Sequence, residues 1–302
     1  MFNYVFAKQI GLINYFLKGP IIKIKKKITR NKIFKFKTIT NKEYLIHKWD
    51  PSGTEVYLTN CFTDWGNEYL FLDSIKEKEK GVFLDIGCHS GYFSCLFNEY
   101  FEKIIGFEPS KKCIPALKLI KKNYSNFDYI TSFVGKVEKI IQANDDDSGY
   151  AFDINSGNIQ TNIINKIKIP QVTIDNFCEK NKINKISAIK IDVDGIDMEV
   201  LQGAKKVITK HRPSIMIEHY SQDLINFFNS LNYDLYTFSS TKKKSYHLKL
   251  EKILSYEDDK WIKMICCVPK EYKKKYEEKK FLGNCFFGIN KNAIIKYFNL
   301  SF

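Results

Sequence analysis

Two acidic residues and a glycine-bracketed turn are the part of the sequence best suited to chemistry. An apolar run leads into Asp85, and Gly87 and Gly91 bracket the turn that follows. The next apolar run ends at Glu108, about two dozen residues after the first acid. A strand, an acidic end and a turn into a helix are typical of the ligand-binding edge of a doubly wound α/β sheet.

The residue types in this turn indicate which kind of nucleotide could bind at such an edge. A dinucleotide fingerprint requires three glycines, but the three positions hold Gly87, His89 and Tyr92. Asp85 would also repel a pyrophosphate, so a ligand with positive charge and no phosphate fits better. S-adenosylmethionine (SAM), which carries a sulfonium and an ammonium group, is such a ligand. Glu108 is placed to accept hydrogen bonds from two adjacent ribose hydroxyls.

These observations predict a donor-binding set at the ends of the first two strands. Within it, Tyr92 is expected to lie along the ligand, and His89 to face either the methionine carboxylate or solvent. The set comprises Asp85, Gly87, His89, Gly91, Tyr92 and Glu108.

A second group of ionisable residues follows two later predicted strands. Asp192 ends one strand, and Glu218 with His219 ends the next, so their side chains are expected to converge over the donor's methyl group. Two ways of activating an acceptor hydroxyl stay open. The three side chains could bind Mg²⁺ or Mn²⁺, which would polarise the hydroxyl. Alternatively, Asp192 orients His219, and His219 acts as a general base without metal.

Six short motifs follow one another along the chain in a recognisable order. They are Asp85-Ile-Gly-Cys-His-Ser-Gly91, Phe107-Glu-Pro109, Val172-Thr-Ile-Asp175, Lys190-Ile-Asp-Val-Asp-Gly195, Glu199-Val-Leu-Gln-Gly-Ala204 and Glu218-His219. This set resembles the FkbM-type family of SAM-dependent methyltransferases over roughly residues 81–220, and the run 190–204 is its most specific part.

The resemblance implies a fold, a cofactor and a reaction. The fold is a Rossmann-like, seven-strand class I methyltransferase sheet of the α/β class, with six parallel strands and the last antiparallel. SAM is the methyl donor, and the reaction is O-methylation, mostly of sugar or polyketide-type hydroxyl groups. Two departures stand out: Cys88-His89 replaces the usual Ala-Asn, and Asp194 replaces the usual Glu.

Composition indicates a globular protein with a basic surface. The 302 residues are 44% hydrophobic and 27% charged, and the formal net charge is +14. Such a surplus suits nucleic acid, anionic lipid or an anionic substrate, although the abundance of Lys, Ile and Asn also fits an AT-rich coding sequence. The eight cysteines form no C-x-x-C pair or metal-finger spacing, which indicates a reducing, cytoplasmic environment.

The sequence predicts three regions: 1–75, 76–270 and 271–302. The first holds an amphipathic helix over 1–19 that ends at Pro20, then a basic run and short strands with a turn at Asp50-Pro51-Ser52-Gly53. The second is the methyltransferase domain, and the third is a mostly helical extension.

Several elements of the second region are predicted individually. Helices are expected over 111–124, 196–210 and 224–231, with Asp194 capping the second of them. Strands are expected over 129–134, 233–238 and 262–268, the last two separated by a lysine-rich loop. The stretch 144–170 is rich in Asn, Gly and Ser, and it is expected to form a lid over the site.

Three functions compete for this fold. The first is O-methylation of a carbohydrate, either nucleotide-activated or lipid-linked. The second is methylation of RNA or protein, which the basic surplus favours. However, Ile191-Asp-Val-Asp-Gly195 lacks the Asn/Asp-Pro-Pro-aromatic motif of amino-group enzymes that act on nucleic acid. The third is a non-catalytic SAM-binding partner.

The first helix and the basic run suggest two kinds of partner. An amphipathic helix followed by lysines can contact a membrane surface peripherally. More often, such a helix packs on its own domain or serves as the contact of a homodimer, so membrane contact is the minor expectation.

Overall fold

The chain folds into two compact units. The first comprises Met1–Lys78 and Ser214–Phe302, and the second comprises Glu79–Pro213. The computed structural model describes residues 11–28, 33–37, 43–47, 51–59, 63–76, 78–145, 151–153, 166–241, 247–272, 280–284, 292 and 296.

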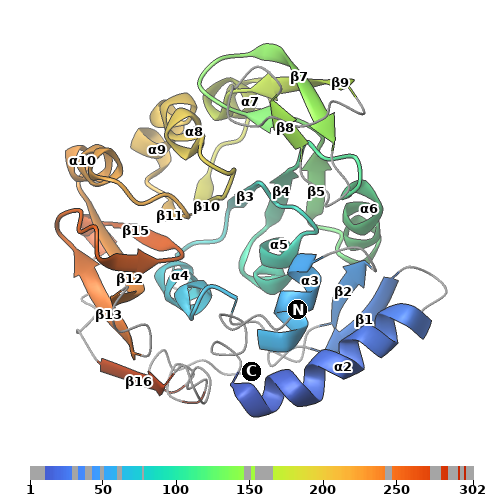
Figure 1. The fold of residues 1–302 in the computed structure, drawn as a ribbon. Helices are drawn as coiled ribbons and strands as arrows, with labels where there is room; N and C mark the ends of the chain where they lie inside the picture. Colours follow the sequence, from blue (N-terminus) through green and yellow to red (C-terminus); the bar gives the residue numbers. More distant parts are fainter. Residues whose placement is uncertain are drawn as a thin grey trace. The chain divides into compact units, whose positions relative to one another are not determined.

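A parallel sheet with the strand order β10-β3-β4-β5 forms the centre of the second unit (Figure 1). Its strands are β3 (Val82–Ile86), β4 (Lys103–Phe107), β5 (Phe127–Ile130) and β10 (Ile186–Ile191). Every residue of β10 is buried, as expected for a parallel strand that is covered on both faces. The register places Asp85 of β3 beside Lys190 of β10 and Gly106 of β4.

Helices follow these strands in the second unit. They are α5 (Tyr92–Leu96), η1 (Asn98–Tyr100), α6 (Ile114–Asn123), α7 (Ile174–Lys180), α8 (Asp197–Gly203) and α9 (Lys205–His211). The single helix predicted over 196–210 is therefore two helices. The break coincides with Gly203, where a Cβ would lie 2.1 Å from the carbonyl oxygen of Gly135, so the chain comes very close to a neighbouring backbone there.

A second, smaller sheet occupies part of the predicted lid. It has the order β6-β9-β7-β8, with β6 (Phe133–Val134), β7 (Lys139–Asp145), β8 (Ala151–Asp153) and β9 (Lys166–Val172). Phe133, Ile141, Ala143 and Ile169 form its buried cluster. The strand predicted over 129–134 is thus divided between two sheets, and residues 146–150 and 154–165 of the lid lie outside the described residues.

The first unit contains a mainly antiparallel sheet and the helix α10 (Gln222–Ser230). Its strands are β11 (Ser214–Ile217), β12 (Tyr233–Thr241), β13 (His247–Ile253), β14 (Lys260–Ile262), β15 (Ile265–Pro269) and β16 (Lys280–Asn284). β15 lies antiparallel to both β11 and β12, which matches the single reversed strand that the family resemblance implies.

The number of strands differs from the expected seven. Counted over the two units, the main strand path has nine members, and β14 pairs with β12 off this path. The additional strands are β13, β14 and β16. The predicted lysine-rich loop contains the strand β13, in which Leu248, Leu250 and Ile253 are buried and Lys249 and Lys252 are exposed; residues 242–246 lie outside the described residues. In the predicted helical extension, the described residues include part of the short helix η3 (Lys270–Tyr272), the strand β16, and residues 292 and 296, which are helical.

The N-terminal part of the first unit begins with α2 (Leu12–Ile28), which contacts α3 (Pro51–Thr59). The prediction that Pro20 ends the helix is wrong, because α2 continues through it. Proline removes one helical hydrogen bond, but Ile22 is buried beyond it and Lys26 hydrogen-bonds Thr54 of α3. Residues 1–10 of the predicted helix lie outside the described residues.

The predicted turn at Asp50–Gly53 is the start of a helix, since Pro51 opens α3, a position that favours proline. Of the predicted short strands, β1 (Ile33–Lys37) and β2 (Glu43–His47) pair antiparallel. The residues after α3 lead into α4 (Asn67–Ile75), all of which is buried. α4 packs against β11, β12 and β15 of the same unit.

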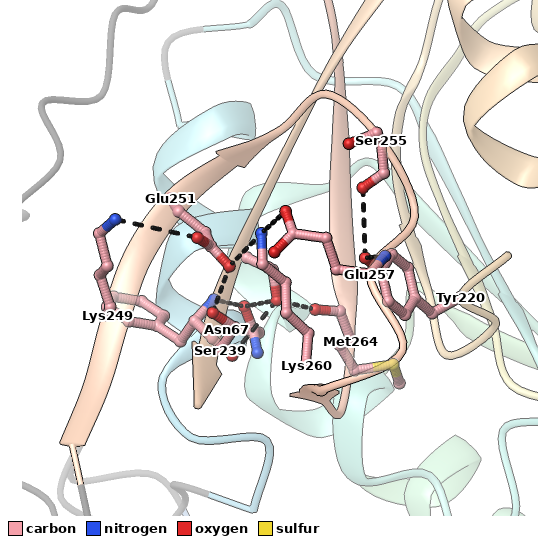
Figure 2. A network of polar contacts seen from close by, with 11 residues as sticks. Asn67, Tyr220, Ser239, Lys249, Glu251, Ser255, Glu257, Lys260 and Met264 are labelled. Carbon is pink, nitrogen blue, oxygen red and sulfur yellow. Dashed lines mark hydrogen bonds and ion pairs between the residues drawn. The ribbon is translucent and has the colours of Figure 1, made fainter. Parts of the chain in front are cut away.

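Two polar side chains fix α4 in place. Glu68 is fully buried and accepts hydrogen bonds from the hydroxyl of Thr63 at 2.9 Å and the backbone N–H groups of Asp64 and Gly66 at 2.7 and 3.0 Å. The carbonyl oxygen of the Asn67 side chain accepts a hydrogen bond from the backbone N–H of Phe238 in β12 at 2.8 Å (Figure 2). These bonds satisfy buried groups that would otherwise cost stability.

None of the helices among the described residues is both long and apolar enough to cross a bilayer.

Candidate functional site

The turn after β3 is held by the backbone of β4. The N–H groups of Gly87 and Cys88 donate to the carbonyl oxygen of Phe107 at 2.9 and 3.1 Å, and Gly91 N–H closes the turn onto the carbonyl of Cys88 at 2.7 Å. Gly87, His89 and Gly91 have φ values of 71°, 47° and 81°. The left-handed region suits glycine, and histidine is among the residues enriched there.

Gly87 also allows two strand ends to approach each other closely. A Cβ at this position would lie 1.9 Å from the carbonyl oxygen of Asp192, which no side chain tolerates. Glycine is therefore required at position 87 for two reasons: its positive φ and its close contact with the carbonyl oxygen of Asp192.

We expect Gly87→Ala to lower the free energy of unfolding by about 2–5 kcal/mol, because it adds a backbone clash to the strain of a positive φ. Gly195→Ala is the matched control: Gly195 has a φ of 97°, but nothing lies within 4 Å of its Cβ position. That variant should cost only about 1–2 kcal/mol. Equal losses in urea denaturation would show that the close approach to Asp192 is unimportant.

Asp85 lies inside β3, and its side chain is fully buried. One carboxylate oxygen accepts hydrogen bonds from the Ser94 hydroxyl at 2.6 Å and the Ser94 N–H at 3.1 Å. The other lies 3.8 Å from Nζ of Lys190. Burial raises the pKa of Asp85, against the opposing effects of Lys190 and Ser94. Asp85 thus fixes α5 and pairs with a buried cation.

Lys190 of β10 contacts the turn after β3, the exit of its own strand and the start of α5. Its ammonium donates to the carbonyl oxygen of Gly87 at 2.7 Å, pairs with Asp192 at 3.2 Å and lies 5.4 Å from the centre of the Phe93 ring. Burial lowers the pKa of Lys190, but the charges of Asp192 and Asp85 outweigh this effect and hold the pKa above its usual value. Lys190 therefore stays charged and orients the strand ends.

Glu108 follows β4 and is 6% exposed. One carboxylate oxygen accepts a hydrogen bond from the N–H of His89 at 2.9 Å, and the other from the N–H of Ser110 at 2.8 Å. A carboxylate oxygen has two lone pairs and can accept more than one hydrogen bond. The acid links the two turns that follow β3 and β4.

The other residues predicted in the turn are largely enclosed. Tyr92 opens α5 and is buried with its ring 4.7 Å from that of Phe93, and His89 is half-buried. Cys88 is buried, and burial followed by the charges of Asp85 and Glu108 raises the pKa of its thiol well above the usual value. A protonated thiol is a poor nucleophile, so Cys88 is not suited to attack a substrate.

Asp192 stands at the exit of β10, where its side chain is 34% exposed. Its backbone N–H continues the parallel ladder to Ile86 at 3.2 Å. The prediction that Asp194 caps the next helix is wrong: α8 has Ile196 as its N-cap and no side-chain cap bond. Instead, Asp197 accepts a hydrogen bond from the N–H of Gly195 at 3.3 Å.

Glu218 and His219 lie in the first unit, directly after β11. Nε2 of His219 lies 2.8 Å from the hydroxyl oxygen of Ser221, which caps α10 by accepting from the N–H of Leu224 at 3.2 Å. Glu218 is exposed. The cap therefore fixes the imidazole edge that carries Nε2.

Tyr220 ties this turn to the segment between β13 and β14 (Figure 2). Its hydroxyl accepts a hydrogen bond from the N–H of Glu257 at 2.9 Å and donates to the carbonyl oxygen of Ser255 at 3.3 Å. Glu257 in turn pairs with Lys260 at 2.7 Å, and Lys260 with the buried Glu251 at 3.2 Å. This polar network supports the segment that carries His219.

A family model described as "Methyltransferase FkbM domain" matches residues 85–254, more than half of the chain. The chain belongs to the FkbM methyltransferase family. No curated protein matches it.

Solved structures that resemble the chain include an FkbM methyltransferase from Methylobacillus flagellatus KT, with 13% identity and a TM-score of 0.38. That match covers 84% of this chain and 60% of the other, so the chain spans less than two thirds of the relative's length. A precorrin-6y C5,15-methyltransferase from Geobacter metallireducens GS-15 has 12% identity and a TM-score of 0.38, and the match covers 67% of this chain and 86% of the other. A putative methyltransferase from Streptococcus mutans, solved with SAH, has 12% identity and a TM-score of 0.37, and the match covers 67% of this chain and 96% of the other.

SAM binding is expected for the FkbM fold, and the charges around its turn fit such a donor. Asp85, Glu108, Asp192 and Asp194 all lie at or just after the ends of β3, β4 and β10, whereas Lys190 offsets only part of their charge. A net negative edge favours the sulfonium and ammonium of SAM over a pyrophosphate. The roles of the individual residues stay predictions.

The metal alternative finds no support in the FkbM domain. Among the described residues, no group of three or more His, Cys, Asp and Glu side chains could hold a metal ion. Asp192 belongs to the second unit, and Glu218 and His219 to the first.

Sequence reasoning missed Lys190, Ser94 and Tyr220. Lys190 carried a signal, since a lysine between Ile189 and Ile191 in a buried strand needs a partner. Ser94 and Tyr220 had no such signal, because their roles depend on residues that only the fold brings near.

Proposed function

We propose that the chain transfers a methyl group from SAM to a hydroxyl of a carbohydrate. The observation that carries the proposal is the acidic edge around the turn after β3, where Glu108 links two turns and Asp192 stands partly exposed. When bound, SAM supplies an electrophilic methyl group. The chain's own residues must then hold the donor, align the acceptor oxygen and remove its proton.

In this proposal, Glu108 accepts hydrogen bonds from the two ribose hydroxyls. The rest of the donor is expected to lie along the turn from Gly87 to Gly91, at the carboxyl end of β3. Lys190 and Asp85 do not act on the acceptor; they keep the ends of β3 and β10 in register.

On the acceptor side, the proposed general base is His219, which takes the proton of the hydroxyl, and the proposed role of Asp192 is to orient His219. A carbohydrate acceptor is supported by the family resemblance and by the lack of an Asn/Asp-Pro-Pro-aromatic motif after β10. The net charge of +14 would help to hold a phosphate-bearing carrier of the sugar.

The test is an incubation with SAM and three substrate classes: nucleotide-activated sugars, total RNA and an unfractionated protein pool. We expect mass spectrometry to find a methyl gain on a nucleotide sugar. Label on RNA or protein instead would reverse the assignment of the acceptor. Absence of SAM and S-adenosylhomocysteine binding in calorimetry would overturn the whole proposal.

The role of Glu108 gives a separate prediction. Glu108→Gln replaces one acceptor oxygen with an N–H donor, so SAM affinity should fall about 10–100-fold. Glu102→Gln, an exposed change just before the same strand, should leave affinity unchanged. Isothermal titration measures both, and thermal unfolding verifies that both fold. Unaltered affinity in the Glu108 variant would show that this acid does not bind the donor.

A further inference from the structure

Helix α2 exposes a continuous apolar stripe (dark blue in Figure 1). The side chains of Leu17, Ile21, Ile24 and Ile28 are 62%, 45%, 56% and 71% exposed. Their spacing of four, three and four residues places them on one face of the helix. Large apolar side chains scattered singly are ordinary on a surface, but an aligned row of them marks an interaction site.

The other side of α2 is already engaged within the first unit. Ile22 is only 2% exposed, and the ammonium of Lys26 hydrogen-bonds the hydroxyl of Thr54. These contacts anchor α2 to α3. The helix is therefore held by one face and presents the apolar stripe on the opposite one.

Positive charge flanks the stripe. Lys23 and Lys27 are exposed, and the last turn of the helix is basic. The sequence of α2 contains no Asp or Glu. An apolar face bordered by lysines, without any acidic residue, is the pattern of a helix that lies in the interface of an anionic membrane.

We propose that α2 docks the protein onto an anionic lipid surface, with the stripe at the boundary between headgroups and acyl chains and the lysines at the phosphates. A second copy of the chain is the main competing occupant, because the same spacing could form a coiled-coil seam. Parallel pairing would bring the two lysine-rich last turns together and add repulsion, whereas anionic lipid neutralises the lysines. The proposal is independent of the methyl-transfer reaction.

The test uses the full chain and flotation with vesicles of phosphatidylcholine alone or mixed with phosphatidylglycerol. Each lysine near an anionic surface contributes measurably to binding, so we expect binding about 100-fold tighter to the anionic vesicles. Ile24→Asn/Ile28→Asn and, separately, Lys23→Glu/Lys27→Glu should each lower it at least about tenfold.

Two controls carry the same chemical changes elsewhere. Leu254→Asn alters an exposed apolar residue outside α2, and Lys206→Glu/Lys210→Glu alters two exposed lysines of α9 at the same spacing as Lys23 and Lys27. Both controls should float like the parent chain. Because all these side chains are exposed, folding should be preserved, and circular dichroism verifies it.

Equal flotation with neutral and anionic vesicles, or wild-type binding by both α2 variants, would overturn the proposal. A lipid-free dimer in light scattering that Ile24→Asn/Ile28→Asn dissociates would assign the stripe to a second copy. A monomer that floats only with anionic vesicles supports the lipid surface.

Discussion

Replacing Lys190 with methionine is expected to lower the free energy of unfolding by about 3–5 kcal/mol, the cost of leaving one member of a buried ion pair without its partner. Asp85 is fully buried 3.8 Å from the ammonium, and the carbonyl oxygen of Gly87 would lose its donor. Methionine keeps most of the side-chain volume, so the loss reports charge rather than packing. Urea denaturation measures it.

The matched control is Lys185→Met, which breaks the ion pair with Glu79 in the same unit. Both partners of that pair are substantially exposed, so the loss should stay below about 1 kcal/mol. The double variant Asp85→Asn/Lys190→Met should be clearly more stable than the sum of the two single changes predicts. Additive losses would mean that the two residues act independently.

The deficit of the Lys190 variant should depend on pH. Burial raises the pKa of Asp85, and the charge of Lys190 is the largest effect that opposes this rise. An acid whose pKa is higher in the folded state loses stability as pH rises through its unfolded value of about 3.9. The difference between the Lys190 and Lys185 variants should therefore be smallest near pH 4 and grow toward neutrality. A constant difference would show that Asp85 is not left charged and unpaired.

Most of the prediction for the donor side came from local sequence patterns. The order of β3, glycine turn, α5 and β4 follows from residues within one short stretch, and the family resemblance and its domain match agree there. Gly87 and Gly91 were recognisable because a turn with positive φ leaves few other choices. The register that sets Asp85 beside Lys190 could not be predicted in this way, since the partners lie in distant parts of the chain.

Some errors came from signals that were present but weighed wrongly. His247–Ile253 alternates apolar and charged residues, which is a strand pattern, yet its lysines suggested a loop. Pro20 suggested a helix end, but packing of α2 on α3 beyond it outweighs one lost hydrogen bond. In each case tertiary burial decided against the local preference.

The general base predicted for methyl transfer leads to the largest expected effect on activity. His219→Gln should lower kcat about 10²–10⁴-fold, because glutamine cannot accept a proton at neutral pH. SAM affinity should not change, since the donor-side residues are on the other unit. His211→Gln, in a half-buried histidine at the end of α9, serves as the matched control and should retain full activity.

The pH profile and a chelator separate this role from the alternatives. If His219 is the base, the acidic limb of the kcat–pH profile disappears in His219→Gln, and wild-type activity survives EDTA and dialysis. Asp192→Asn should then lower kcat but keep that limb, because the base itself is still present. Activity that EDTA abolishes and Mg²⁺ or Mn²⁺ restores would instead assign Asp192, Glu218 and His219 to a metal. An unchanged kcat in His219→Gln would remove the histidine from the mechanism.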